Sequence, residues 1–158
     1  MGAYSNFGFA KVYTDKTALS AIYFLDTKVL PVYGQFNLPL DRVLTDNGKE
    51  YITHWANGKH EYEKYLQTHN ISHTKIKPRI LKSKGIVERF NRTLAEEFYL
   101  IAMTEKVYTS RPQLQDDLDK FITYYNFKRT NQGHKLKGKI PYQRFFDGKR
   151  KYALTEPL

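Results

Sequence analysis

Residues 42–51 have the sequence RVLTDNGKEY, in which a short apolar run ends at a turn signal. The run predicts a strand over 42–45, and the triplet DNG at 46–48 predicts the turn that ends it, because these residues are favoured in tight turns. Asp46 therefore follows a strand, at the edge where α/β sheets present functional groups. Taken alone, an Asp before Asn-Gly is a common structural turn residue, so its role depends on the rest of the chain.

The segments around this strand alternate between strand and helix patterns. Upstream, the apolar spacing predicts a strand over 4–13 and then a helix capped at 14–15, which Pro31 should kink or end because proline lacks an N–H donor. Downstream, the spacing predicts a helix over 61–68 and a short strand around 72–77. Strands that alternate with helices indicate an α/β fold.

The second half of the chain has helical spacing over most of its length. One predicted helix covers 84–104, with the apolar stripe Val87, Phe90, Leu94, Phe98 and Ile101. A second begins at a Ser110-x-x-Gln113 capping box, with the stripe Leu114, Leu118, Phe121, Ile122 and Tyr125. We expect both stripes to be core, and the Gly, Lys and Pro content from Phe127 onward predicts an extended basic arm.

Composition limits the class of protein. The chain has 158 residues, enough for one hydrophobic core, and its hydrophobic fraction of 41% is too high for a disordered tail. No segment approaches the roughly 20 apolar residues of a membrane span, and the first ten residues lack the features of a signal peptide. The absence of cysteine excludes disulfides and thiolate zinc sites, and it is compatible with a reducing bacterial cytoplasm, where we expect the protein.

The net charge of +10 is concentrated in two blocks. Residues 75–92 contain seven basic side chains and one acidic, and residues 128–151 contain nine and one, whereas residues 1–74 are neutral in sum. Clustered Lys and Arg interleaved with Tyr and Phe favour a nucleic-acid partner. A merely basic surface and an anionic membrane are the alternatives; the membrane is the weaker one, because no predicted helix pairs a basic face with a large apolar one.

A second carboxylate, Glu88, lies near the start of the predicted helix over 84–104. By itself it would form a surface ion pair with Lys84 or Arg92, which lie four residues away on either side. Together with Asp46, however, it supplies the oxygen ligands that a Mg²⁺-dependent phosphoryl-transfer site needs. We expect the DNA phosphates near this site to contact the cations Lys82, Lys84, Arg89 and Arg92.

Three motifs and the tail of the sequence resemble those of a known family. RVLTDNGKEY at 42–51, ISHTKIKP at 71–78 and KGIVERFNRTLAEEFY at 84–99 are similar to the catalytic core of bacterial insertion-sequence transposases and retroviral integrases, the DDE type. YYNFKRTNQGHKLKGKIPYQRF at 124–145 resembles the region after that core in the bacterial members. The resemblance implies a ribonuclease H-like α/β fold, a mixed sheet with flanking helices. It divides the chain into a core over 1–127 and a basic C-terminal extension over 128–158.

The resemblance also implies an activity and a site. Members cleave DNA strands and join them to target DNA, and they bind two Mg²⁺ or Mn²⁺ ions through two Asp and one Glu. Asp46 matches the second Asp and Glu88 matches the Glu. The partners implied are DNA, both element ends and target, and further copies of the chain. In the basic extension we expect DNA contacts from Lys128, Arg129, Lys135 and Lys137.

This sequence departs from the family pattern at the first Asp. The family's first strand, which carries it, has no match here, and Asp15, Asp26 and Asp41 do not substitute because they lie at the wrong places in their elements. Leu81 and Lys84 replace a common Pro and Asn. We therefore expect weak or absent metal binding and little or no transposase activity. The alternative is a catalytically silent DNA-binding or assembly fragment. Strand edges left open by the missing strand would favour a homo-oligomer.

Overall fold

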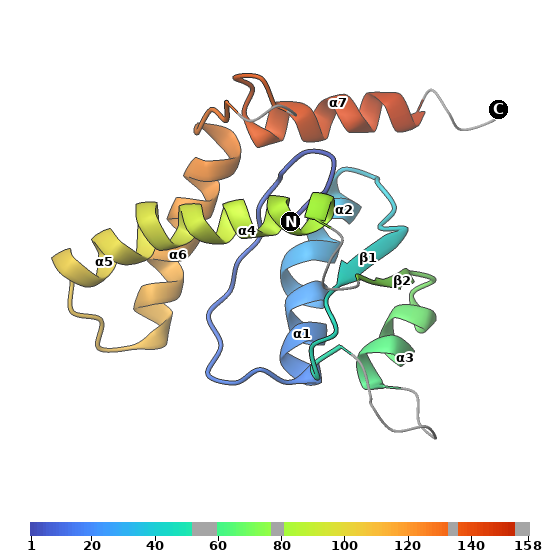
Figure 1. The fold of residues 1–158 in the computed structure, drawn as a ribbon, viewed down its shortest axis with the longest axis horizontal. Coiled ribbons are helices and arrows are strands. Elements are labelled where there is room, and N and C mark those ends of the chain that lie inside the picture. The colour runs from blue at the N-terminus through green and yellow to red at the C-terminus, as the bar shows by residue number, and fades with distance from the viewer. Residues whose placement is uncertain (52–59, 77–80, 133–135, 154–158) are drawn as a thin grey trace. The chain divides into compact units, whose positions relative to one another are not determined.

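A computed structural model describes residues 1–51, 60–76, 81–132 and 136–153 (Figure 1). The chain divides into two compact units, one formed by residues 13–81 and the other by residues 1–12 together with 82–158. The predicted division at residue 127 stays a prediction. Within the described part of the chain, no helix has both the length and the apolar character needed to cross a membrane.

The unit of residues 13–81 contains the sheet. Its elements are α1 (Ala18–Phe24), a π-helical turn (Leu25–Val29), α2 (Leu30–Gln35), β1 (Arg42–Thr45), α3 (Glu61–Thr68) and β2 (Ser72–Lys75). In the described residues the sheet has two strands, β1 and β2, which run parallel with Arg42 opposite Ser72 and Thr45 opposite Lys75. The predicted helix over 61–68 and the strands at 42–45 and near 72–77 are confirmed, and Lys77 lies outside the described residues.

The first helix differs from its prediction at both ends. Its N-cap is Thr17 rather than residues 14–15, and the Thr17 hydroxyl accepts a hydrogen bond from the Ser20 amide at 3.2 Å. Pro31 does not end the helical run. The chain widens into a π-helical turn just before it, where the Leu30 amide donates to the Leu25 carbonyl, and α2 then continues from Leu30. The wider turn accommodates a proline ring that an unbroken α-helix would not.

The second unit is helical. Its elements are α4 (Leu81–Leu94), a π-helical turn (Ala95–Tyr99), α5 (Leu100–Glu105), α6 (Arg111–Phe127) and α7 (Pro141–Ala153). Its buried cluster combines both predicted stripes: Phe90, Leu94, Phe98, Ala102, Leu118 and Tyr125. Val87 and Ile101 are instead 46% and 47% exposed. The extra residue of the π-helical turn moves the buried face from Ile101 to Ala102.

The predicted strand over 4–13 is wrong, because its backbone finds partners on a helix instead of in a sheet. The buried amide of Asn126 accepts from the Gly8 N–H at 2.7 Å and donates to the Gly8 carbonyl at 2.9 Å. Gln115, three turns earlier on α6, accepts from the Val12 N–H at 2.8 Å. A Cβ at Gly8 would come within 2.5 Å of the Phe90 ring, so only glycine permits this close approach.

The predicted extended conformation of the tail is also wrong, since residues 141–153 form α7. Phe145, on the buried face of α7, packs against Phe7 with ring centroids 5.0 Å apart. Gln143 accepts from the Ile140 amide at 3.2 Å and so caps the helix start.

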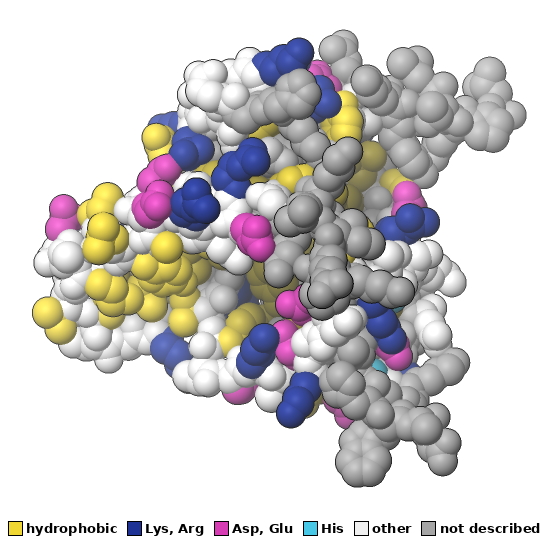
Figure 2. Space-filling model, in the orientation of Figure 1, with side chains coloured by type: hydrophobic (Ala, Val, Ile, Leu, Met, Phe, Trp, Pro, Cys, Tyr) yellow, Lys and Arg dark blue, Asp and Glu magenta, His cyan; other side chains and the backbone are white. Residues whose placement is uncertain are grey.

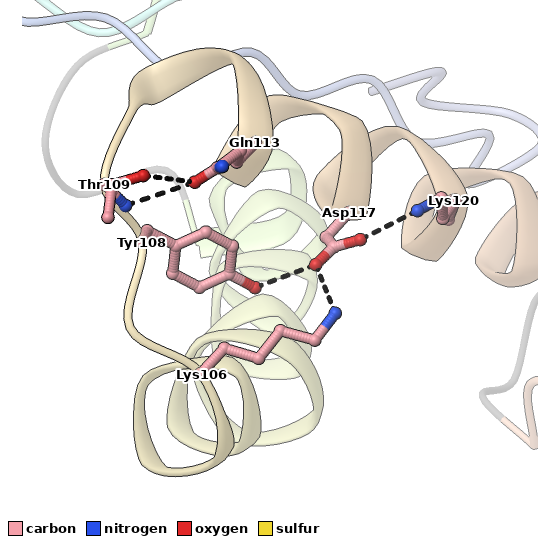
Figure 3. Close-up of polar contacts among 6 residues, drawn as sticks. All are labelled: Lys106, Tyr108, Thr109, Gln113, Asp117 and Lys120. Carbon is pink, nitrogen blue, oxygen red and sulfur yellow. Dashed lines mark hydrogen bonds and ion pairs between the residues drawn. The ribbon is translucent and has the colours of Figure 1, made fainter.

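The connection between α5 and α6 is tied to α6 by its polar groups (Figure 3). Asp117 accepts from Lys106 at 2.6 Å, from the Tyr108 hydroxyl at 3.1 Å and from Lys120 at 2.9 Å. These donors, Lys106 first, hold the pKa of the Asp117 carboxyl well below its usual range. The predicted capping box forms only in part: Ser110 is the N-cap, but Gln113 bonds to Thr109.

Candidate functional site

Asp46 follows β1 directly, as the sequence predicts, and its side chain is exposed. Its Oδ1 accepts a hydrogen bond from the Gly48 amide at 3.0 Å, so the side chain closes the turn that its own sequence motif predicts. A Cβ at Gly48 would lie 2.6 Å from the carboxylate of Glu50, so Glu50 packs directly against Gly48. The strand thus ends in a short, fixed loop that holds an exposed carboxylate at its start.

Glu50 is a buried carboxylate that the sequence interpretation missed. It is 6% exposed, and its Oε1 forms an ion pair with Nζ of Lys16 at 3.0 Å. The Glu50 carboxylate raises the pKa of Lys16 above its ordinary value, and Asp46 acts in the same direction. The signal was available in the motif, because Glu50 follows Asp46 by four residues within RVLTDNGKEY.

A second set of polar groups supports β1 from β2. His73 Nε2 lies 2.8 Å from the hydroxyl of Thr45, the buried residue before Asp46. Burial lowers the pKa of His73, while Glu63, whose Oε1 lies 3.7 Å from His73 Nδ1, opposes this shift. Lys75 binds the same Glu63 oxygen at 2.6 Å and lowers the pKa of that carboxyl. His73 therefore meets Thr45 as a neutral ring that fixes the end of the strand.

Glu88 lies on an exposed face of α4 together with Arg89 and Arg92, while Phe90 points into the core. Figure 2 shows Lys and Arg side chains next to acidic ones over the visible face of this helix. The side chains of Lys82 and Lys84 lie outside the described residues. Glu88 thus has the exposure that a metal ligand needs and the basic neighbours that a phosphate site needs.

The basic block over 128–151 is partly occupied by internal contacts. Arg129 binds Glu97 through two hydrogen bonds, of 2.7 Å and 2.5 Å, and lies over the ring of Tyr125. Lys139 pairs with Asp147 at 2.9 Å. Lys128 and Lys137 are exposed, and Lys135 lies outside the described residues. The charge of Arg129, a member of the predicted DNA-binding set, is therefore compensated within the fold.

The donor chemistry at Asp46 and Glu88 fits a hard divalent cation, because both are exposed carboxylates. Asp46 belongs to the unit of residues 13–81 and Glu88 to the other unit, so their convergence stays a prediction. Over the ranges that the structure describes, no group of three or more His, Asp or Glu is arranged to hold a metal ion.

The chain is similar in sequence to an integrase family and to two curated relatives. A family model described as "Integrase core domain" matches residues 69–137. The ORF3 protein of Spiroplasma virus SpV1-C74, whose name assigns it to the integrases, is 29% identical over 103 residues, 61% of this chain and 27% of that protein. The Retrovirus-related Pol polyprotein from transposon TNT 1-94 of Nicotiana tabacum is 34% identical over 86 residues, 48% of this chain and 6% of that protein. The chain therefore spans a small part of either relative.

Comparison with solved structures gives the same fold. The catalytic core domain of BIV integrase matches with a TM-score of 0.67 and 19% identity, covering 96% of this chain and 85% of that one. A chain of the simian T-cell lymphotropic virus intasome in complex with PP2A regulatory subunit B56 gamma matches with a TM-score of 0.60 and 22% identity, covering 83% and 41%. The predicted α/β, ribonuclease H-like class is confirmed.

Proposed function

We infer from the membership of this chain in the integrase catalytic core superfamily that it serves DNA strand cleavage and transfer by metal-dependent phosphoryl transfer. The observation that carries this proposal is Asp46, held at the end of β1 by its hydrogen bond from Gly48. A carboxylate fixed directly after a buried strand residue is pre-oriented for a cation and needs little reorganisation on binding.

In this proposal Asp46 and Glu88 are the metal ligands, and Mg²⁺ or Mn²⁺ is the ion. When bound, the ion would stabilise the negative charge on the attacking and leaving oxygens of the phosphate. Arg89 and Arg92, exposed on the same helix as Glu88, would bind the neighbouring phosphates and fix the register of the DNA strand. Lys128 and Lys137 would extend this contact along the DNA.

We propose further that a polypeptide of these 158 residues is catalytically silent. Two of the family's three carboxylates have matches in the sequence, and no residue matches the first Asp. Two carboxylates compensate less of the charge of a divalent cation than three do, so the ion would be held weakly. The polypeptide would then act on DNA by binding it and by assembling with further copies. Among the described strands, β1 and β2 each retain an unpaired edge, which favours that assembly.

A cleavage assay on supercoiled and linear duplex DNA with Mg²⁺ or Mn²⁺ tests this function. The 158-residue polypeptide is expected to leave the DNA intact, because it supplies two ligands. A chain extended at its N-terminus by a strand that carries an Asp is expected to nick the DNA, and Asp46→Asn or Glu88→Gln in that chain should abolish nicking. Nicking by the unextended polypeptide that Asp46→Asn removes would refute its silence. An extended, folded chain that never nicks would favour the binding role.

A further inference from the structure

The turn that carries Asp46 contains an ion pair that the proposed metal site does not use. Lys16 precedes the N-cap of α1, is 77% exposed, and reaches across to the buried Glu50 carboxylate at 3.0 Å. Glu50 in turn lies against Gly48, whose amide holds Asp46. One exposed cation and one buried anion thus flank the carboxylate that is proposed to bind the ion.

The charges in this cluster act on one another. The pKa of Lys16 is raised first by its hydrogen bond to Glu50 and also by the charge of Asp46. The pKa of Tyr51, next in sequence to Glu50, is raised by burial and then by Glu50 and Asp46, while Lys16 opposes the shift. Lys16 therefore lies within electrostatic range of Asp46, and Glu50 lies against Gly48, whose amide donates to Asp46.

We propose that Lys16 and Glu50 tune the divalent-cation affinity of Asp46 in opposite directions, Lys16 lowering it and Glu50 raising it. This rests on the proposed function, since it takes Asp46 as a metal ligand. The physical reason is Coulombic: an ammonium repels a divalent cation and a carboxylate attracts it. While Lys16 and Glu50 are paired, their opposite charges nearly cancel, so the cation affinity depends on Asp46 and the other ligands. Loss of either residue leaves the charge of the other uncompensated.

Mn²⁺ titration followed by NMR measures this directly, because Mn²⁺ broadens the amide signals near its site and the Gly48 amide is bonded to Asp46. Lys16→Met should tighten Mn²⁺ binding by about three- to tenfold and Glu50→Gln should weaken it by a similar factor, as expected for one charge near a divalent ion in high dielectric. The double variant should return close to the original affinity. The differences in Mn²⁺ affinity between these variants should become smaller in about 0.5 M salt, because salt screens the charges.

Two control variants separate the outcomes. Lys64→Met removes an exposed lysine from α3 in the same unit and should leave the affinity unchanged. Asp46→Asn should abolish the broadening of Gly48; broadening absent even from the unsubstituted chain would overturn the proposed function itself. Broadening that depends on Asp46 but is unchanged or weakened in Lys16→Met would overturn this inference alone. Lys16 is mostly exposed, so its variant carries the test even where Glu50→Gln fails to fold.

Discussion

DNA affinity of this chain is expected to fall by about 10³- to 10⁵-fold between about 50 and 200 mM monovalent salt. Of the eight cations predicted to contact DNA, Arg129 is bound to Glu97. The other seven would neutralise phosphates and release their counterions, and about six to ten such contacts produce a fall of this size. Fluorescence anisotropy of a labelled duplex, titrated at several salt concentrations, gives the slope of log affinity against log salt.

Arg89→Gln with Arg92→Gln should lower that slope by about 2, because each lost phosphate contact removes about 0.9. Lys106→Gln is the matched control: its charge is already compensated by Asp117 at 2.6 Å, so the slope should stay the same (Figure 3). Arg129→Gln should also change it little, since Arg129 is bound to Glu97. Affinity that is independent of salt would remove the charge argument for a DNA partner.

Asn126→Ala should destabilise the unit of residues 1–12 and 82–158 by about 2–6 kcal/mol. Asn126 is 2% exposed, and its side chain satisfies both the N–H and the carbonyl of Gly8. Truncation leaves two buried backbone groups without partners, at about 1–3 kcal/mol each. Urea unfolding followed by circular dichroism gives the loss, and hydrogen exchange of the Gly8 amide gives its local component.

The matched control is Asn91→Ala, which removes an exposed asparagine from α4 and should change stability by less than about 0.5 kcal/mol. Asn126→Asp keeps an acceptor for the Gly8 N–H but loses the donor for its carbonyl, so it should also destabilise. Equal stability of the Asn126 and Asn91 variants would show that the Gly8 backbone has other partners.

The elements whose patterns are local were predictable. The strand over 42–45, the helix over 61–68 and the core stripe through Phe90, Leu94 and Phe98 are present, because periodicity alone specifies them. The segment over 4–13 was not, since its N–H groups at Gly8 and Val12 donate to the side chains of Asn126 and Gln115, more than 100 residues away. No local pattern reveals that side chains of a helix, rather than a neighbouring strand, will form the hydrogen bonds of this backbone.

The tail and the site show the same limit. The spacing of Tyr142, Phe145 and Phe146 is helical, but Gly148 and the surrounding lysines favoured the prediction of an extended arm. The packing of Phe145 on Phe7 stabilises the helix instead. At the site, the sequence predicts Asp46 and its turn, whereas the Lys16–Glu50 pair depends on the tertiary approach of two loops.

We infer that Asp46 and Glu88 ligate the same divalent cation. Mn²⁺ titration of the unsubstituted chain, Asp46→Asn, Glu88→Gln and the double variant tests it, with the Gly48 and Glu88 amide signals followed together. If both residues ligate one ion, both signals should broaden at the same Mn²⁺ concentration, and each substitution should weaken Mn²⁺ binding by about tenfold or more. The double variant should bind Mn²⁺ no more weakly than the single variant with the lower affinity. Unchanged broadening of Gly48 in Glu88→Gln would contradict it.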